Sequence, residues 1–153
     1  LVGRVNVRGG ILVIAAAPGC LLAAGLALAL VLGAIDRHPM WPYVALNLSE
    51  AAGARDEGEV ARLIAYGEDP NTRREVRAGV IFARATRLTP LEAAVAVDDP
   101  SILTRLLTLG ATLDADVWNR LRCIADGDEV PPVLDARRPE GVELHCVGVT
   151  PPW

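Results

Sequence analysis

The chain has 153 residues, of which 52% are hydrophobic and only 4% aromatic, and its formal net charge is −4. This length allows one ordinary domain with additional segments, but not two full domains. Three cysteines are too few for a dense disulfide scaffold, and the hydrophobic share excludes a long disordered acidic chain. The acidic balance excludes a strongly basic nucleic-acid binder, so no nucleic-acid partner is expected.

Residues 11–35, after an amino-terminal tail at 1–10, form an apolar run without a single charge. As a helix the run would measure roughly 37 Å, enough to cross a hydrocarbon core of about 30 Å. It is too long for the apolar region of a signal peptide, and the polar tether of a lipoprotein does not follow Ala17–Cys20. The pattern therefore predicts a transmembrane helix over 11–35, with the lipid bilayer as a partner. Arg4 and Arg8 precede it, which predicts a carboxyl-terminal domain outside the cytoplasm.

A linker at 36–45 leads into a repeat with a gapless period of 43 residues. The pairs of similar residues at this offset are Leu48 with Leu91, Ala51 with Ala94, Val60 with Leu103, Leu63 with Leu106, Ile64 with Leu107, Gly67 with Gly110 and Asn71 with Asp114. Each copy contains two short apolar stripes at helical spacing and closes on a glycine. The repeat therefore predicts helix–turn–helix units that end in a left-handed cap.

The second copy carries the clearest local signals. Thr89-Pro90-Leu91-Glu92 is a capping box, in which Thr89 is the N-cap and Glu92 reaches back to its backbone. The first helix is expected over about 90–97, and Asp99-Pro100 begins the next helix by the same logic. Gly110 is expected to end that second helix.

At these positions the chain resembles the ankyrin-repeat family. The residues that carry the resemblance are Thr89-Pro90-Leu91, Ala93-Ala94, Leu106-Leu107 and Gly110-Ala111 in the second copy, and Leu48, Ala51-Ala52, Leu63-Ile64 and Gly67-Glu68-Asp69-Pro70-Asn71 in the first. The resemblance covers roughly 46–114 and implies a stack of helix pairs that binds proteins through hairpin tips and first-helix faces. The family period is 33 residues, which leaves about ten extra residues in an inserted loop at 72–88. Glu92 also stands where the family usually has His.

The expected architecture is all-α, with segments in this order: the transmembrane helix over 11–35, an ankyrin-like repeat domain over 46–126, and an irregular, proline-rich tail over 127–153. Two repeat units alone are marginal, because each buries its apolar face only on a neighbour. A helix at 116–125 is therefore expected to cap the stack, with Trp118 in the core. Val142–Val149 reads as one short strand, whose possible partner is 80–83.

Residues suited to catalysis are scarce. His38 and His145 are the two histidines, and the sequence contains no zinc, phosphate-loop or dinucleotide motif. We therefore expect no enzymatic activity, no metal and no cofactor. In an oxidising location outside the cytoplasm, Cys123 and Cys146 could form a disulfide, the alternative being two free thiols.

Candidate partner-binding residues gather in the inserted loop and the adjacent first helix. They are the basic residues Arg73, Arg74, Arg77, Arg84 and Arg87, the apolar residues Val80, Ile81 and Phe82, and the acidic residue Glu92. A basic stripe can bind acidic partners, and an apolar side chain can anchor an interface. The alternative is a solvated loop without a partner.

The function predicted from these features is a membrane-anchored ankyrin-repeat scaffold that binds another protein and has no catalysis of its own. Two alternatives remain open. One is a secreted protein released by cleavage near residue 34. The other is a secreted or envelope protein whose tail carries a small metal or catalytic site built from His145, Cys146 and neighbouring acids.

Overall fold

A computed structural model describes residues 22–31 and 45–153. The chain divides into two units, residues 1–45 and 46–153, and each is described by itself. In the first unit, residues 22–31 are helical and expose leucine side chains at positions 22, 26, 28 and 30. At about 1.5 Å per residue, such a helix measures about 15 Å, half the thickness of a hydrocarbon core.

Within the described ranges, 22–31 and 45–153, no helix is both long enough and apolar enough to cross a membrane. The predicted transmembrane helix over 11–35 is therefore wrong, and so is the single-pass membrane location with an outside carboxyl-terminal domain. The prediction equated the length of an uncharged run with the length of one helix, but apolar composition alone does not fix where a helix begins and ends. Residues 11–21 and 32–35 of the predicted span lie outside the described residues.

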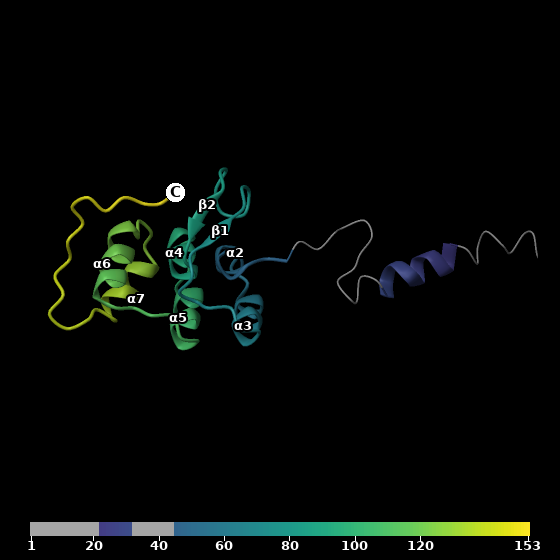
Figure 1. Ribbon diagram of the computed structural model, residues 1–153, viewed down its shortest axis with the longest axis horizontal. Helices are drawn as coiled ribbons and strands as arrows, with labels where there is room; N and C mark the ends of the chain where they lie inside the picture. The colour runs from purple at the N-terminus through teal and green to yellow at the C-terminus, as the bar shows by residue number, and fades with distance from the viewer. Residues whose placement is uncertain (1–21, 32–44) are drawn as a thin grey trace, which may run out of the picture. The chain divides into compact units, whose positions relative to one another are not determined.

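Residues 46–153 form helix pairs and one β-hairpin (Figure 1). In chain order the elements are α2 (Leu48–Gly53), α3 (Glu57–Ala65), β1 (Arg74–Val76), β2 (Thr86–Leu88), α4 (Pro90–Ala96), α5 (Pro100–Thr108), α6 (Ala115–Ile124) and α7 (Val130–Asp135). The first helices of the pairs, α2, α4 and α6, lie side by side in one row, and α3, α5 and α7 form a second row. Buried side chains from both rows make one hydrophobic core.

The two-stranded sheet makes the all-α prediction wrong. β1 pairs antiparallel with β2 inside the inserted loop, with Glu75 opposite Arg87. Val76 and Leu88 are buried at the hairpin base and belong to the core. Side chains of the first repeat also hold the hairpin, because Ser49 Oγ donates to the Leu88 carbonyl at 2.8 Å. The inserted loop is therefore a folded part of the stack.

The first helix of each of the first two pairs begins with a capping box. Asn47 and Glu50 form it in α2, and Thr89 and Glu92 form it in α4, which confirms the prediction for the second copy. These boxes lie 42 residues apart, whereas the N-caps of α3 and α5, Asp56 and Asp99, lie 43 apart. α2 is one residue shorter than α4, so the gapless period of 43 is wrong over the first helix. The glycine turns fit that period, and Gly110 has the predicted positive φ, of 103°.

The predicted capping helix is present as α6, and Trp118 is buried in the core as expected. A further helix, α7, follows in the segment predicted to be irregular. The indole Nε1 of Trp118 donates to the Leu134 carbonyl at 2.7 Å and joins the two helices. α6 and α7 thus form a third helix pair. The predicted strand is absent from residues 142–149, which lie within the described part of the chain.

The start of α7 is capped from the second repeat. The Asp98 carboxylate accepts hydrogen bonds from the backbone N–H groups of Asp128, Glu129 and Val130, at 3.0, 3.2 and 2.9 Å. Burial acts to raise the pKa of Asp98, but these hydrogen bonds outweigh it and hold the pKa below its ordinary value. A Cβ on Gly127 would lie 2.1 Å from the Asp98 Cγ, so this contact requires glycine.

Candidate functional site

The hairpin is joined to α2 through the buried carboxylate of Glu50, which is 1% exposed. Arg77, just after β1, donates to it from its backbone N at 2.9 Å, from Nε at 2.6 Å and from Nη2 at 2.7 Å. The Asn47 backbone N adds a fourth hydrogen bond at 3.2 Å. Burial acts to raise the pKa of Glu50, but the hydrogen bonds and the positive charge of Arg77 outweigh it, so this pKa lies below its ordinary value.

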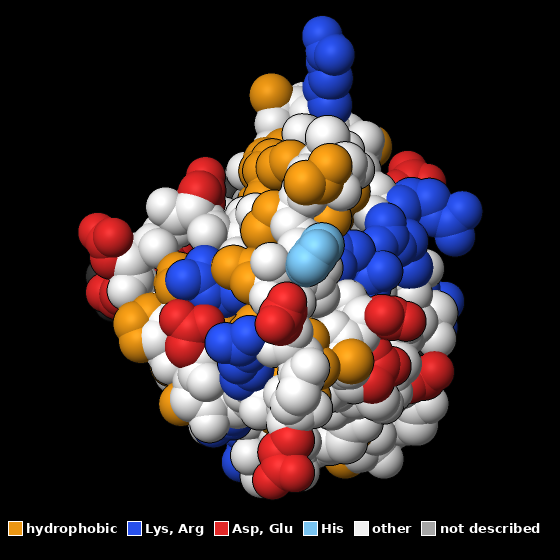
Figure 2. Space-filling model, turned by 90° about the vertical axis from the view of Figure 1, so that its left-hand side faces the viewer, with side chains coloured by type: hydrophobic (Ala, Val, Ile, Leu, Met, Phe, Trp, Pro, Cys, Tyr) orange, Lys and Arg blue, Asp and Glu red, His pale blue; other side chains and the backbone are white. Residues whose placement is uncertain are grey.

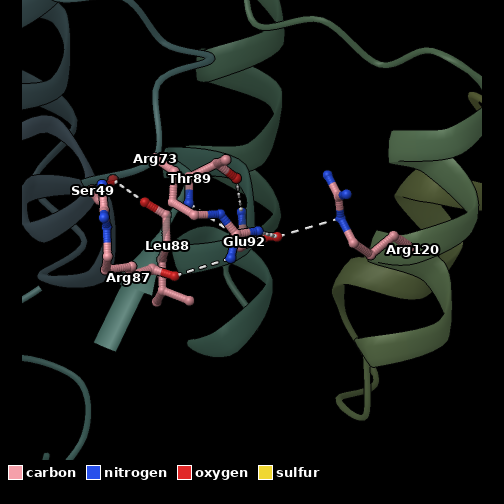
Figure 3. A network of polar contacts seen from close by, with 7 residues as sticks. All are labelled: Ser49, Arg73, Arg87, Leu88, Thr89, Glu92 and Arg120. Carbon is pink, nitrogen blue, oxygen red and sulfur yellow. Dashed lines mark hydrogen bonds and ion pairs between the residues drawn. The ribbon is translucent and has the colours of Figure 1, made fainter. Parts of the chain in front are cut away.

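The equivalent carboxylate of the second repeat, Glu92, is completely buried and lies between two arginines (Figure 3). Arg73 donates to Glu92 Oε1 and, through Nη1, to the Arg87 carbonyl at 3.2 Å. Arg120 approaches from α6, with Nε 3.4 Å from Oε1. The Thr89 backbone N donates to the other oxygen at 2.9 Å. One negative charge therefore faces two positive charges, and the cluster as a whole carries a net charge of +1.

A groove of about 320 Å³ opens beside this cluster. Two turns and the first residues of α4 and α6 line it, through Pro70, Asn71, Thr89, Leu91, Thr112, Asp114, Val117 and Arg120. The turns are fixed to each other, because Asn71 Oδ1 accepts a hydrogen bond from the Thr112 backbone N at 2.7 Å. Asp114 caps α6 by accepting from the Val117 backbone N at 2.8 Å. The groove is therefore held by polar contacts between consecutive repeats.

The Arg120 guanidinium lies at this groove and has N–H donors that no hydrogen bond within the described residues uses. Its side chain is 44% exposed. Apart from the contact at Nε, its donors have no hydrogen-bond partner among residues 22–31 and 45–153. The adjacent Asp114 carboxylate is engaged in the cap of α6. A ligand oxygen placed in the groove would therefore meet free donors of a guanidinium beside apolar side chains such as Leu91 and Val117.

The predicted partner-binding residues divide into three groups in the structure. Arg73, Arg77 and Glu92 are engaged in internal ion pairs, and Glu92 is inaccessible to a partner. The apolar residues are half-buried and pack against the core: Val80, Ile81 and Phe82. The remaining arginines of the loop are exposed: Arg74, Arg84 and Arg87. The predicted set therefore contains internal supports of the hairpin as well as surface residues.

None of the residues that line the groove is among the predicted partner-binding residues. Asn71 and Asp114 were visible as equivalent turn residues of the two copies, but Arg120 and Thr112 gave no signal of their own. The signal that could have found them is the repeat itself. Polar residues at equivalent turns of stacked repeats come to lie next to each other, and the first helix of the following repeat completes the wall.

The two cysteines of the described segments are bonded to each other. Cys123 in α6 and Cys146 in the tail have an S–S distance of 2.08 Å and a Cα–Cα distance of 5.3 Å. Beside this bond, the Asn119 side chain pairs with the backbone of His145, donating to its carbonyl at 2.7 Å and accepting from its N–H at 2.8 Å. Cys146 is therefore not a free thiol for a metal or for nucleophilic catalysis.

Residues 22–31 and 45–153 contain no group of three or more His, Cys, Asp or Glu side chains placed to hold a metal ion. Compared with protein-family models, with curated proteins and with solved structures, the chain gives no significant match.

Proposed function

We propose that residues 46–153 form a helical-repeat module that binds a segment of another protein and catalyses no reaction. The observation that carries the proposal is the groove between α4 and α6, with Arg120 at its edge. The resemblance of residues 46–114 to ankyrin repeats supports it, since such stacks bind partners on the side where turns and first helices meet.

The groove has the chemistry of a peptide site rather than that of a reaction site. It combines apolar side chains with a few polar groups, as sites that orient a ligand do. The free donors of Arg120 suit a carboxylate or carbonyl oxygen of the partner. The exposed arginines of the hairpin add positive charge that speeds association with an acidic partner.

Site-specific photo-crosslinking of the full chain tests the proposal. A photoreactive residue replaces Thr112, which lines the groove, and a matched control replaces Thr108, an exposed threonine at the end of α5. We expect a discrete protein adduct from position 112 that is absent from position 108 and is lost when Arg120→Ala is added. Equal adducts from both positions, or an adduct at 112 that persists in Arg120→Ala, would contradict the proposal.

A further inference from the structure

The tail after α7 returns along the domain to the hairpin. In Figure 1 it leaves α7, runs outside the helices and ends near β2. Its attachments to α6 are the Asn119–His145 pairing and the Cys123–Cys146 disulfide, while Arg138 Nε donates to the Val142 carbonyl at 2.6 Å within the tail itself. Up to Cys146 the tail is therefore fixed to α6.

Beyond Cys146, the tail touches the domain at few points. Its residues are exposed except for the half-buried Val149 and Trp153, and Val147 is 96% exposed. The indole of Trp153 stacks on the ring of Phe82, with centroids 5.3 Å apart and planes inclined by 12°. Residues 147–153, here named the strap, thus bridge from the disulfide to the hairpin.

The surface that receives the strap is the apolar part of the hairpin loop, here named the hairpin patch (Val80, Ile81 and Phe82). Ile81 packs on α2, where a Cβ on Gly53 would lie 2.1 Å from its Cδ1. Phe82 directs its ring to Trp153. Figure 2 shows hydrophobic side chains, in orange, gathered in the upper part of the face toward the viewer. They lie above the pale blue histidine side chain, and blue arginine side chains lie to their right.

We propose that the hairpin patch is a docking surface for an aromatic side chain, that the chain's own Trp153 occupies it, and that the Cys123–Cys146 disulfide raises its occupancy. The segment that precedes Trp153 is Thr150-Pro151-Pro152, and prolines lose little backbone freedom on docking. Stacked aromatic rings add attraction beyond the area that they bury. A partner that presents an aromatic side chain after prolines therefore competes with the strap for one surface.

The disulfide acts on the strap through the length of the tether. With the bond intact, Trp153 lies seven positions after its anchor at Cys146. Once the bond is broken and the Asn119–His145 pairing opens as well, the nearest helix end is Asp135, eighteen positions away. Loop-closure entropy grows as three halves of the logarithm of loop length, so the ratio of closed to open strap falls by up to about fourfold. The chemistry is thiol–disulfide exchange: a dithiol reductant supplies two electrons and two protons, two cysteine thiols form, and the reductant becomes a disulfide.

¹⁹F NMR of the full chain labelled with 5-fluorotryptophan tests this inference. Trp153→Phe assigns the signal of Trp153, and the signal of the buried Trp118 reports whether the domain remains folded. In the oxidised chain we expect Phe82→Ala to move the Trp153 signal, and Val147→Ala, a change at an exposed position of the strap, to leave it in place. Reduction with a dithiol should move the signal toward its position in Phe82→Ala. If Phe82→Ala disturbs Trp118, Phe82→Leu replaces it, because leucine keeps the apolar bulk without the ring.

A peptide with the sequence of residues 147–153 supplies the second measurement. Added at millimolar concentration to the reduced Trp153→Ala chain labelled with ¹⁵N, it should shift the amide resonance of Phe82, and the same peptide with alanine for tryptophan should not. The proposal is overturned by a Trp153 signal that ignores Phe82→Ala and Phe82→Leu, by one that ignores reduction, or by equal shifts from the two peptides. All three readouts concern the tail and the hairpin, so they are independent of whether a protein binds the groove.

Discussion

Replacing Glu50 by glutamine should lower the free energy of unfolding, because it removes the charge that joins α2 to the hairpin. The carboxylate accepts four hydrogen bonds, of which two come from the Arg77 guanidinium. In Glu50→Gln an amide NH₂ group, which is a donor, replaces one of the two accepting oxygens and faces the N–H donors of Arg77. Arg77 is 41% exposed on its side chain, so water solvates the released guanidinium in part. The loss is therefore below the 3–5 kcal/mol of a fully buried pair, and we expect about 2 kcal/mol at pH 7.

The pH dependence of this loss follows from the lowered pKa of Glu50. A carboxyl whose pKa is lower in the folded state stabilises the fold above its ordinary pKa of about 4.3, and this contribution disappears as the pH falls through the lowered value. The difference between the native chain and Glu50→Gln should therefore be full at pH 7 and shrink below about pH 4.

Urea unfolding of the full chain, followed by far-UV circular dichroism at pH 7 and at pH 3, measures both effects. With a slope of about 1–3 kcal/mol per molar urea, the expected loss corresponds to a midpoint about 1 M lower at pH 7. Glu57→Gln, at an exposed position in the first turn of α3, is the matched control and should change the midpoint little. A loss at pH 7 no larger than that of Glu57→Gln, or an equal loss at pH 3, would refute the reasoning.

Three further changes test other contacts. Gly53→Ala should destabilise the chain by about 1 kcal/mol, because the new Cβ overlaps Ile81. Adding Ile81→Ala should restore the midpoint of urea unfolding, and a double variant whose loss equals the sum of the two single losses would contradict the contact. Trp118→Phe should cost about 2–3 kcal/mol through the lost hydrogen bond to α7 and a small cavity, measured by urea unfolding, and a neutral result would contradict that packing. Joint replacement of Cys123 and Cys146 by serine should lower the free energy of unfolding by up to about 3.4 kcal/mol, as expected for a loop with a sequence separation of 23 residues. Thermal unfolding with and without reductant should differ in the native chain but not in the double variant.

The capping signals were readable from the sequence because their partners lie within a few residues. Thr89 and Glu92 exchange hydrogen bonds across one turn, and the Asp99 carboxylate caps α5 by accepting from the backbone N–H groups of Ser101 and Ile102. The period of 43 was readable over α3, α5 and their glycine turns, because the two copies have the same residue spacing there. It failed over α2, since a single missing residue inside a short helix leaves the apolar pattern almost unchanged.

α7 was missed because Pro131 and Pro132 suggested irregular structure. Both prolines lie in the first turn of the helix, where backbone N–H groups have no acceptor within the helix, so a missing N–H costs little there. The cap that completes this turn comes from Asp98, about thirty residues earlier in the chain. Local patterns carry no information about such a distant partner.

The inserted loop shows the same limit for the candidate site. Its charged and apolar side chains suggested a surface for a partner, yet Arg77 contacts Glu50 across 27 residues and Phe82 contacts Trp153 at the far end of the chain. Charge and hydropathy identify side chains that need a partner. They do not tell whether the partner belongs to the same chain, which is decided by tertiary packing.

The contact from Asp98 to α7 also determines how the stack assembles. In a linear array of repeats, each unit is stabilised by its own interactions and by its interface with the neighbour. Here the carboxylate that caps α7 is that of Asp98, which lies in the turn between α4 and α5. The first turn of α7 is therefore stabilised only once the second pair has formed, because starting a helix is the costly step. Folding is therefore expected to propagate from the second pair outward, with the third pair adding last and fraying first.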